Sequence, residues 1–161
     1  MAYNIEGIKE EWLKPLGSDT EKLILYVHGG GYVYGSCNDH NGFVSKFAKA
    51  TCVTNLIYEY RLAPENPFQA ALEDSMKNYQ ILLSSGYKPK NILIAGESAV
   101  GGLCLALLLA MKDRKIDLPV AAVAISSWTD LTFSSESCRT KTKYPPLRSI
   151  HMDGSKQILC E

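Results

Sequence analysis

The chain has 161 residues, 46% of them apolar and 21% charged, and its 17 basic side chains balance 17 acidic ones. This length and composition are typical of one soluble globular domain. Zero net charge without a basic run argues against nucleic acid as the main partner. The longest apolar run, residues 103–111, is far shorter than the ~18 residues that a membrane span needs.

The first residues contain neither the charged nor the apolar region of a secretion signal, so we expect a cytoplasmic protein with reduced thiols. The cysteines are odd in number and widely spaced, and no Cys-x-x-Cys pair or zinc-like cluster with histidine occurs. No dinucleotide or P-loop motif follows a strand. We therefore expect neither a metal ion nor another cofactor. The cysteines are Cys37, Cys52, Cys104, Cys138 and Cys160.

The first third of the chain contains two apolar runs. Residues 1–20 are polar and are expected to be irregular, with a short strand around 11–14. Residues 22–27 form a compact apolar run that predicts a buried strand. Helical spacing of apolar residues predicts a short amphipathic helix over 42–50, and the Val, Ile, Tyr and Thr content of 52–60 predicts a second strand.

The same alternation continues downstream. Apolar residues three and four apart predict a surface helix over 68–84. Residues 91–95 predict a third buried strand, 99–112 a helix packed on most sides, and 120–126 a fourth strand. Residues 133–161 are mostly polar, and we expect them to be irregular or disordered.

Strands and helices thus alternate, and the strands are nearly continuous apolar runs. Such strands lie in a parallel sheet that helices cover on both faces. The expected fold class is α/β, with a mostly parallel sheet flanked by helices. Ligands of these sheets bind at the carboxyl ends of the strands, so the residues at those ends are the candidates for a site.

One strand end leads into Gly96-Glu97-Ser98-Ala99-Val100. A strand that turns sharply into a helix lifts a serine hydroxyl out of the turn, and the next backbone N–H can donate to a developing oxyanion. Small residues flank such a serine, and Gly96 meets this requirement. Val100 stands where a second small residue is usual, and its branched side chain can tilt the helix or displace Ser98. The alternative is a strand-to-helix turn with an incidental serine.

The first buried strand ends in His28-Gly29-Gly30-Gly31. Successive glycines let the main chain approach a ligand and point N–H groups at it. Because a second donor turn lies at Ser98, we interpret this loop as part of an oxyanion hole. A structural tight turn is the alternative.

None of the three histidines is expected to be a catalytic base. His28 immediately precedes the glycines, where we expect it to orient the loop through hydrogen bonds. His40 lies in a polar stretch and His151 in the irregular tail, and neither has the context of a strand end.

Four segments together resemble the hormone-sensitive-lipase-like group of α/β-hydrolases, in that family's order and at about its spacing. The resemblance extends over roughly residues 20–132, with a weaker extension to about residue 11. It implies an α/β-hydrolase core and hydrolysis of a small carboxylic ester. The segments are His28-Gly-Gly-Gly-Tyr-Val-Tyr-Gly-Ser36, Tyr60-Arg-Leu-Ala-Pro-Glu-Asn-Pro67, Gly96-Glu-Ser-Ala99 and Trp128-Thr-Asp-Leu131.

The resemblance also implies roles for single residues. Ser98 matches the family's nucleophile, and Gly30, Gly31 and Ala99 match its oxyanion donors. A further group matches supporting positions that fix loops rather than contact substrate. This group is His28, Gly29, Tyr60, Arg61, Gly96 and Glu97.

The chain departs from the family after its fourth segment. The family has a catalytic acid in an Asp-Pro loop and a catalytic histidine before glycine, and neither pair occurs after Ser98 here. The half with the nucleophile is present without the acid and base half. We therefore divide the chain into an N-terminal segment (1–20), a partial hydrolase core (21–132) and a diverging tail (133–161).

A serine without its base is a poor nucleophile, and losing one triad member lowers kcat by ~10⁴–10⁶. The sequence therefore favours an ester-hydrolase-like enzyme that needs residues outside this chain, from a C-terminal half or from an oligomer, with the chain alone weak or inactive. The alternative is a non-catalytic binding or interaction remnant of the fold. An open sheet that stops after its fourth parallel strand also exposes an edge and apolar faces, so we expect poor solubility or self-association.

Overall fold

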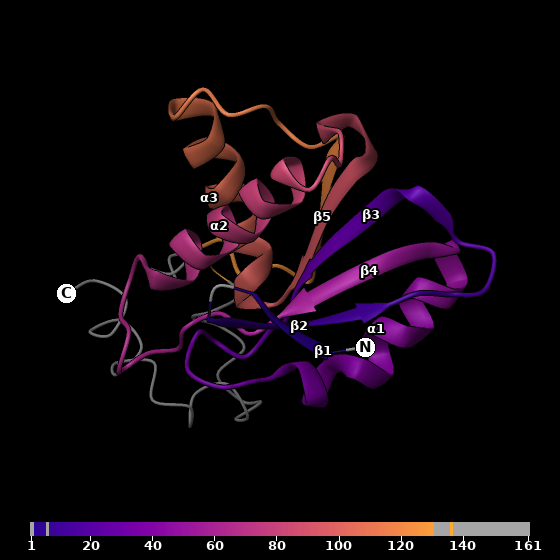
Figure 1. The fold of residues 1–161 in the computed structure, drawn as a ribbon. Coiled ribbons are helices and arrows are strands. Elements are labelled where there is room, and N and C mark those ends of the chain that lie inside the picture. The colour runs from indigo at the N-terminus through magenta and orange to yellow at the C-terminus, as the bar shows by residue number, and fades with distance from the viewer. Residues whose placement is uncertain (1, 6, 131–135, 137–161) are drawn as a thin grey trace.

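The computed structural model describes residues 2–5, 7–130 and 136, which contain one six-stranded sheet and three α-helices (Figure 1). The strands are β1 (Ala2–Ile5), β2 (Ile8–Leu13), β3 (Asp19–Val27), β4 (Val53–Tyr58), β5 (Ile92–Glu97) and β6 (Ala121–Ile125). The helices are α1 (Cys37–Thr51), α2 (Ala70–Ser84) and α3 (Ala99–Asp113), with a 3-10 turn η1 (Pro89–Asn91) before β5. No helix of these residues is both long and apolar enough to cross a membrane.

The strand order is β1-β2-β4-β3-β5-β6, with β4, β3, β5 and β6 parallel, β2 antiparallel to β4 and β1 antiparallel to β2. The α/β prediction of a mostly parallel sheet is therefore confirmed. After β3 the chain steps to β4 on one side and then returns to β5 on the other. This reversal of direction places a crevice at the carboxyl ends of β3 and β5, where ligands of open α/β sheets bind.

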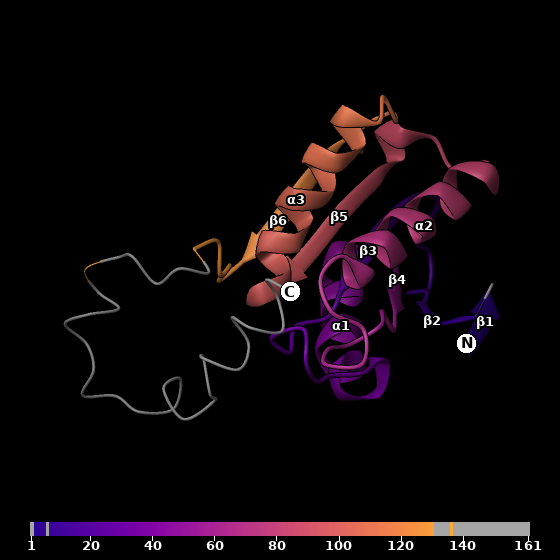
Figure 2. The ribbon, with the colours of Figure 1, turned by 90° about the vertical axis from the view of Figure 1, so that its left-hand side faces the viewer.

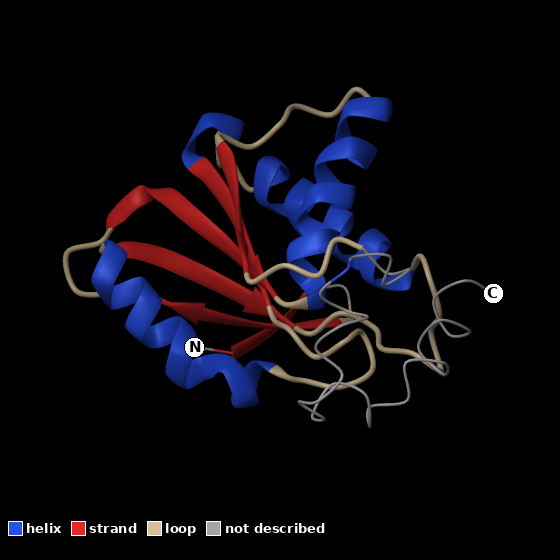
Figure 3. Ribbon diagram, turned by 180° about the vertical axis from the view of Figure 1, so that it is seen from behind, coloured by secondary structure: helices blue, strands red, loops and turns tan. Residues whose placement is uncertain are grey.

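The helices cover both faces of the sheet. Figure 3 shows α1 on one side and the pair α2 and α3 on the other, and Figure 2 shows β6 beside β5 beneath α3. Alternate residues of a strand point to opposite faces, and β3 follows this rule. Leu23, Leu25 and Val27 belong to the larger core beneath α2 and α3, whereas Ile24 and Tyr26 pack toward α1.

The prediction for residues 1–20 was wrong in one respect, because the structure contains a complete hairpin, β1–β2, within a stretch that was expected to be irregular apart from a strand near 11–14. These strands are rich in polar side chains and therefore lack the apolar pattern that predicts a strand. Lys9 reaches Glu59 at 2.7 Å, and Glu11 accepts from Asn41 at 2.6 Å. Ion pairs and hydrogen bonds here replace the apolar alternation that marks most strands.

The remaining elements agree with the sequence, with shifts at their ends. The largest shift is at α1, which begins at Cys37 rather than at residue 42. Ser36 is its N-cap, and the Ser36 Oγ accepts from the Asp39 backbone N–H at 3.3 Å. A capped start of this kind is favourable even without apolar residues in the first turn. The predicted irregular tail, residues 133–161, lies outside the described residues apart from residue 136.

Candidate active site

Ser98 occupies a strained turn between β5 and α3, with φ 57° and ψ −128°. Few non-glycine residues adopt such angles, which persist only where the surroundings enforce them. The backbone of Ser98 is held by three hydrogen bonds. Its N–H donates to the Ile125 carbonyl at 2.9 Å, and its carbonyl accepts from Gly101 at 3.1 Å and Trp128 at 2.8 Å.

This turn exposes the serine side chain while its neighbours are buried. Ser98 is exposed, whereas Ala99 and Val100 are fully buried. The Ser98 hydroxyl makes no capping bond to α3. The N–H groups of a helix's first turn have no partner within the helix, so an exposed hydroxyl lies beside backbone donors. Such a turn can present a nucleophile and stabilise negative charge next to it.

Close packing explains the glycine before the serine. A Cβ at Gly96 would lie 2.7 Å from the Cys104 Sγ and 3.0 Å from the Val100 carbonyl oxygen. Val100 itself is accommodated in the core beneath α2 and α3. The helix makes its other close approach, to the loop after β6, at Gly101 and Gly102. Here small residues are required at positions 101 and 102, and Ser98 adopts the turn with valine at position 100.

The glycine loop after β3 lies against the Ser98 turn. Gly30 has φ 131°, and a Cβ there would overlap the Tyr34 carbonyl, so only glycine fits. Gly29 packs so closely on Glu97 that an added Cβ would lie 3.0 Å from its Cγ. The two strand ends that the sequence singled out are thus brought together.

His28, buried at the start of this loop, holds it through hydrogen bonds and ring stacking. It is buried, its Nδ1–H donates to the Gly29 carbonyl at 2.8 Å, and its ring stacks on Tyr60 at 4.5 Å between centroids. The Tyr60 hydroxyl donates to the His28 carbonyl at 3.0 Å. Burial lowers the pKa of His28, which favours the neutral ring. These contacts fit a residue that orients the loop.

His40 and Tyr32 are residues of the site that sequence reasoning missed. The His40 Nε2 lies 3.2 Å from the Glu97 Oε1, and its ring packs on His28 with centroids 5.1 Å apart. In the sequence His40 lies in a polar stretch without the context of a strand end. The Ser36 and Asp39 pair could have located it, because a helix capped at Ser36 puts His40 in the first turn of the helix that follows the glycine loop.

Tyr32 connects three of the four sequence segments. Its hydroxyl donates to the Ala99 carbonyl at 2.8 Å, and its own carbonyl accepts from the Ala63 N–H at 2.9 Å. Burial raises the pKa of Tyr32, so the hydroxyl stays protonated and able to donate. Its φ of 66° shows that this conformation is held by those contacts. Ser98 is therefore flanked by two anchored residues, Glu97 through His40 and Ala99 through Tyr32.

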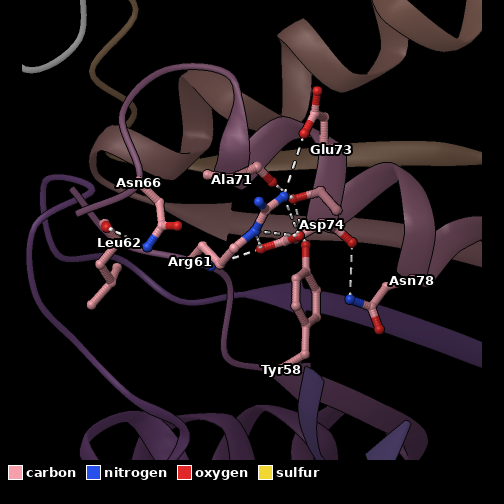
Figure 4. A network of polar contacts seen from close by, with 9 residues as sticks. Tyr58, Arg61, Leu62, Asn66, Ala71, Glu73, Asp74 and Asn78 are labelled. Carbon is pink, nitrogen blue, oxygen red and sulfur yellow. Dashed lines mark hydrogen bonds and ion pairs between the residues drawn. The ribbon is translucent and has the colours of Figure 1, made fainter. Parts of the chain in front are cut away.

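Arg61 braces the loop after β4 against α2 (Figure 4). Its Nη2 lies 2.9 Å from the Asp74 Oδ1, and its backbone N–H donates to the Asp74 Oδ2 at 2.8 Å. A weaker contact of 3.4 Å joins Arg61 to Glu73. Below it, the Tyr58 hydroxyl donates to Ser75 at 2.7 Å. Arg61 thus serves to fix the loop that carries Tyr60.

Comparison with known proteins identifies the fold family. A family model described as the α/β-hydrolase fold matches residues 24–160. The chain belongs to the α/β-hydrolase fold family. An acetyl-hydrolase of Streptomyces hygroscopicus is 41% identical over 131 residues, which are 81% of this chain and 44% of that protein. A hormone-sensitive lipase of Mus musculus is 30% identical over 135 residues, 80% of this chain and 17% of that protein.

Solved structures of the same family resemble this chain. The crystal structure of an esterase/lipase from an uncultured bacterium superposes with a TM-score of 0.89 at 39% identity, covering 96% of this chain and 52% of that one. An esterase of the bacterial hormone-sensitive-lipase family gives a TM-score of 0.82 at 40% identity, with coverages of 85% and 46%. The resemblance seen in the sequence is therefore confirmed. The chain spans about half the length of several curated relatives.

Both histidines of the described residues are engaged in contacts within the chain. His28 is bound to its own loop and His40 faces Glu97. The same part of the chain has no group of three or more His, Cys, Asp and Glu side chains placed to hold a metal ion. What it contains is a presented serine, a glycine loop and the contacts that join them.

Proposed function

We propose that this chain provides the nucleophile and the oxyanion hole of a serine carboxylic-ester hydrolase. Ser98 is the nucleophile, and the N–H groups of Gly30, Gly31 and Ala99 are the oxyanion donors. The observation that carries the proposal is the Ser98 turn, in which a strained backbone presents an exposed hydroxyl at the N-terminus of α3. The esterase and acetyl-hydrolase names of the relatives support the same reaction class.

The reaction follows from this arrangement. The Ser98 Oγ attacks the ester carbonyl carbon, and a base takes its proton. The carbonyl oxygen becomes an oxyanion that the three N–H groups stabilise. The tetrahedral intermediate expels the alcohol, which receives the proton, and water then releases the acid from the acyl-serine. The chain's own residues supply the attack and the charge stabilisation.

In this proposal the base lies outside residues 2–5, 7–130 and 136, in the rest of the chain, in a longer form of the protein or in a partner chain. Without it, the oxyanion hole and substrate binding leave ~10³–10⁴ of acceleration over water. We therefore propose that the chain alone reacts slowly with activated acylating reagents and has little turnover.

Labelling with an alkyl fluorophosphonate, followed by intact mass, tests the proposal. Wild-type protein is expected to gain one adduct and Ser98→Ala none, because only Ser98 lies in the donor turn. Ser85→Ala, at an exposed serine after α2, is the matched control and keeps the adduct. Absence of an adduct on the wild type, or its persistence in Ser98→Ala, contradicts the proposal.

Added imidazole sharpens this test. A small base in solution can take the proton that the absent histidine would accept. Labelling of Ser98 at constant pH is expected to accelerate with imidazole concentration. A rate that does not respond to imidazole would mean that the missing group is something other than a base.

A second candidate is a non-catalytic ligand-binding remnant of the hydrolase fold. The observation that favours it is the engagement of both described histidines in structural contacts. Binding of an ester without any adduct at Ser98 would support this candidate over the first.

A further inference from the structure

Both ring nitrogens of His40 lie within hydrogen-bond distance of an oxygen atom. The Nδ1 is 3.0 Å from the Ser36 backbone carbonyl oxygen, and the Nε2 is 3.2 Å from the Glu97 Oε1. A backbone carbonyl oxygen only accepts hydrogen bonds, so the Nδ1 carries a proton and donates to Ser36. A neutral imidazole has one N–H, and an ionised carboxylate has no proton to donate. The contact between Nε2 and Oε1 therefore contains a second proton, which His40 and Glu97 share.

The residues that pack on this pair from β3 and the start of the glycine loop are uncharged. The His28 ring lies 5.1 Å from the His40 ring, centroid to centroid. Burial and the nearby His40 lower the pKa of His28, so it adds no second positive charge. On β3, burial and the Glu97 carboxylate raise the pKa of Tyr26, so it adds no negative charge. Among these groups, Glu97 is the partner for the charge on His40.

The other titratable groups of this region have their own partners or are neutral. On α1, Asp39 accepts from the Ser36 hydroxyl at 2.6 Å, and burial raises the pKa of the Cys37 thiol to about 12. After β4, Glu59 accepts from Lys9 at 2.7 Å. With these groups engaged elsewhere, the state of the contact between His40 and Glu97 depends on its own proton.

Glu97 connects this contact to the reactive serine. It is the last residue of β5 and directly precedes Ser98. Its side chain also packs on the glycine loop, where a Cβ added to Gly29 would lie 3.0 Å from the Glu97 Cγ. If the shared proton leaves to solvent, two acceptors face each other at 3.2 Å, and the carboxylate, whose side chain is 26% exposed, turns toward water. The strained angles of Ser98 persist only where the surroundings enforce them, so the turn would lose one of its supports.

We propose that His40 is a positioning residue for Ser98, and that it acts through the proton it shares with Glu97. The proton holds the end of β5 in place, and its loss to solvent as the pH rises lowers the reactivity of Ser98. The reaction itself rests on the proposed function, whereas the coupling between the proton and the Ser98 turn does not. A displacement of ~1 Å can lower a rate by ~100-fold, so we expect a loss of about tenfold or more.

The rate of Ser98 labelling by an alkyl fluorophosphonate, measured from pH 6 to pH 9, tests the proposal. Every rate is divided by that of Glu97→Gln at the same pH, which removes the general effect of hydroxide on a serine hydroxyl. In Glu97→Gln the amide N–H can donate to a neutral His40, so this contact needs no second proton. The wild-type ratio is expected to fall about tenfold over this range.

Two further variants complete the series. Lys46→Gln removes an exposed charge from the same helix and is the control, so its ratio should fall like that of the wild type. His40→Phe keeps a ring beside His28 without either nitrogen, and its ratio should be low and independent of pH. A constant ratio in the wild type, or a fall that persists in His40→Phe, would overturn the proposal.

Nuclear magnetic resonance reports on the same coupling without a reaction. The nitrogen signals of the His40 ring and of the Ser98 amide are expected to change together between pH 6 and pH 9, and the Ser98 amide should stay fixed in Glu97→Gln. If no fluorophosphonate labels Ser98 but these signals change together, the proposed function fails and the positioning role stands. If Ser98 is labelled but its amide does not follow the His40 ring, or if the ring keeps one protonation state throughout, the positioning role is wrong. This arm needs no His40 variant, so it also decides the question if His40→Phe does not fold.

Discussion

Two regions of the sheet differ in how many of their side chains and backbone groups have partners within the described residues. One is the end of the sheet where β3, β4 and β5 lead into loops, and the other is the outer side of β6. At the loop end, each segment is tied to another: Tyr32 to Ala99 at 2.8 Å, and His40 to Glu97 at 3.2 Å. On the β6 side, within the described residues, the strand pairs only with β5 and apolar side chains face outward. These are Leu105, Leu109, Leu118, Val120 and Val123.

The candidate site uses only the inner side of β6, where the Ile125 carbonyl and the Trp128 N–H bond to Ser98, and makes no use of its outer apolar side chains. The chain holds its serine turn with its own residues and leaves an apolar surface of the kind that marks an interaction site. The predicted exposed edge is thus present, and self-association remains a prediction that follows from it. Four experiments test this difference.

The largest effect is expected from adding one methyl group at the loop end of the sheet, beside Ser98. Gly96→Ala would place a Cβ 2.7 Å from the Cys104 Sγ, and overpacking of this kind costs about 1–3 kcal/mol. Gly42→Ala, in open space on α1, is the control and should stabilise by about 0.5–1 kcal/mol through helix propensity. Urea unfolding measures both. Equal effects of the two substitutions would mean that the Ser98 turn is not tightly packed.

A charged side chain on the outer side of β6 tests whether that surface drives self-association. If the β6 surface drives self-association, Val123→Lys should raise the apparent dissociation constant by about tenfold or more, because lysine on an edge strand opposes pairing. Leu16→Lys, in the fully exposed turn before β3, should change nothing. Sedimentation velocity measures the effect. A wild type that stays monomeric at tens of micromolar would show that the surface is not used between copies.

Removing one hydroxyl group at the loop end tests whether the contact between Tyr32 and Ala99 positions Ser98. Tyr32→Phe removes the bond to Ala99 and is expected to cost about 1 kcal/mol of stability and to slow labelling of Ser98 about tenfold. Tyr34→Phe, at a half-exposed tyrosine of the same loop, is the control. A lowered melting temperature with an unchanged labelling rate would make Tyr32 structural without a role in positioning.

The smallest expected effect is a dependence of stability on pH. Burial lowers the pKa of His28, so the unfolded chain takes up the proton more readily than the folded one. Stability contributed above the ordinary histidine pKa of ~6.5 is therefore lost as the pH falls below it. Urea midpoints from pH 7.5 to 5 should fall, and less steeply in His28→Gln. An identical slope in that variant would assign the effect to other groups.

Local patterns predicted the parallel strands, the three helices and the two strand ends that meet at Ser98. Apolar runs and glycine turns can be recognised from neighbouring residues in the sequence alone. They did not predict β1, whose polar residues pair through the backbone with β2. Nor did they predict the contacts of Tyr32 with Ala99 or of His40 with Glu97. Those partners are more than 50 residues apart, and each contact depends on the order of the strands.

The bonds that join Ser98 to β6 and to the loop after it bear on protein engineering. A strand, turn and helix look like a cassette that could be grafted onto another sheet. The Ser98 N–H, however, donates to Ile125, and its carbonyl accepts from Trp128. A transplant that ended with α3 would leave both groups without these partners in the recipient. The smallest transferable unit therefore runs from β5 through Trp128, and a library that recombines hydrolases should place its crossover after that residue.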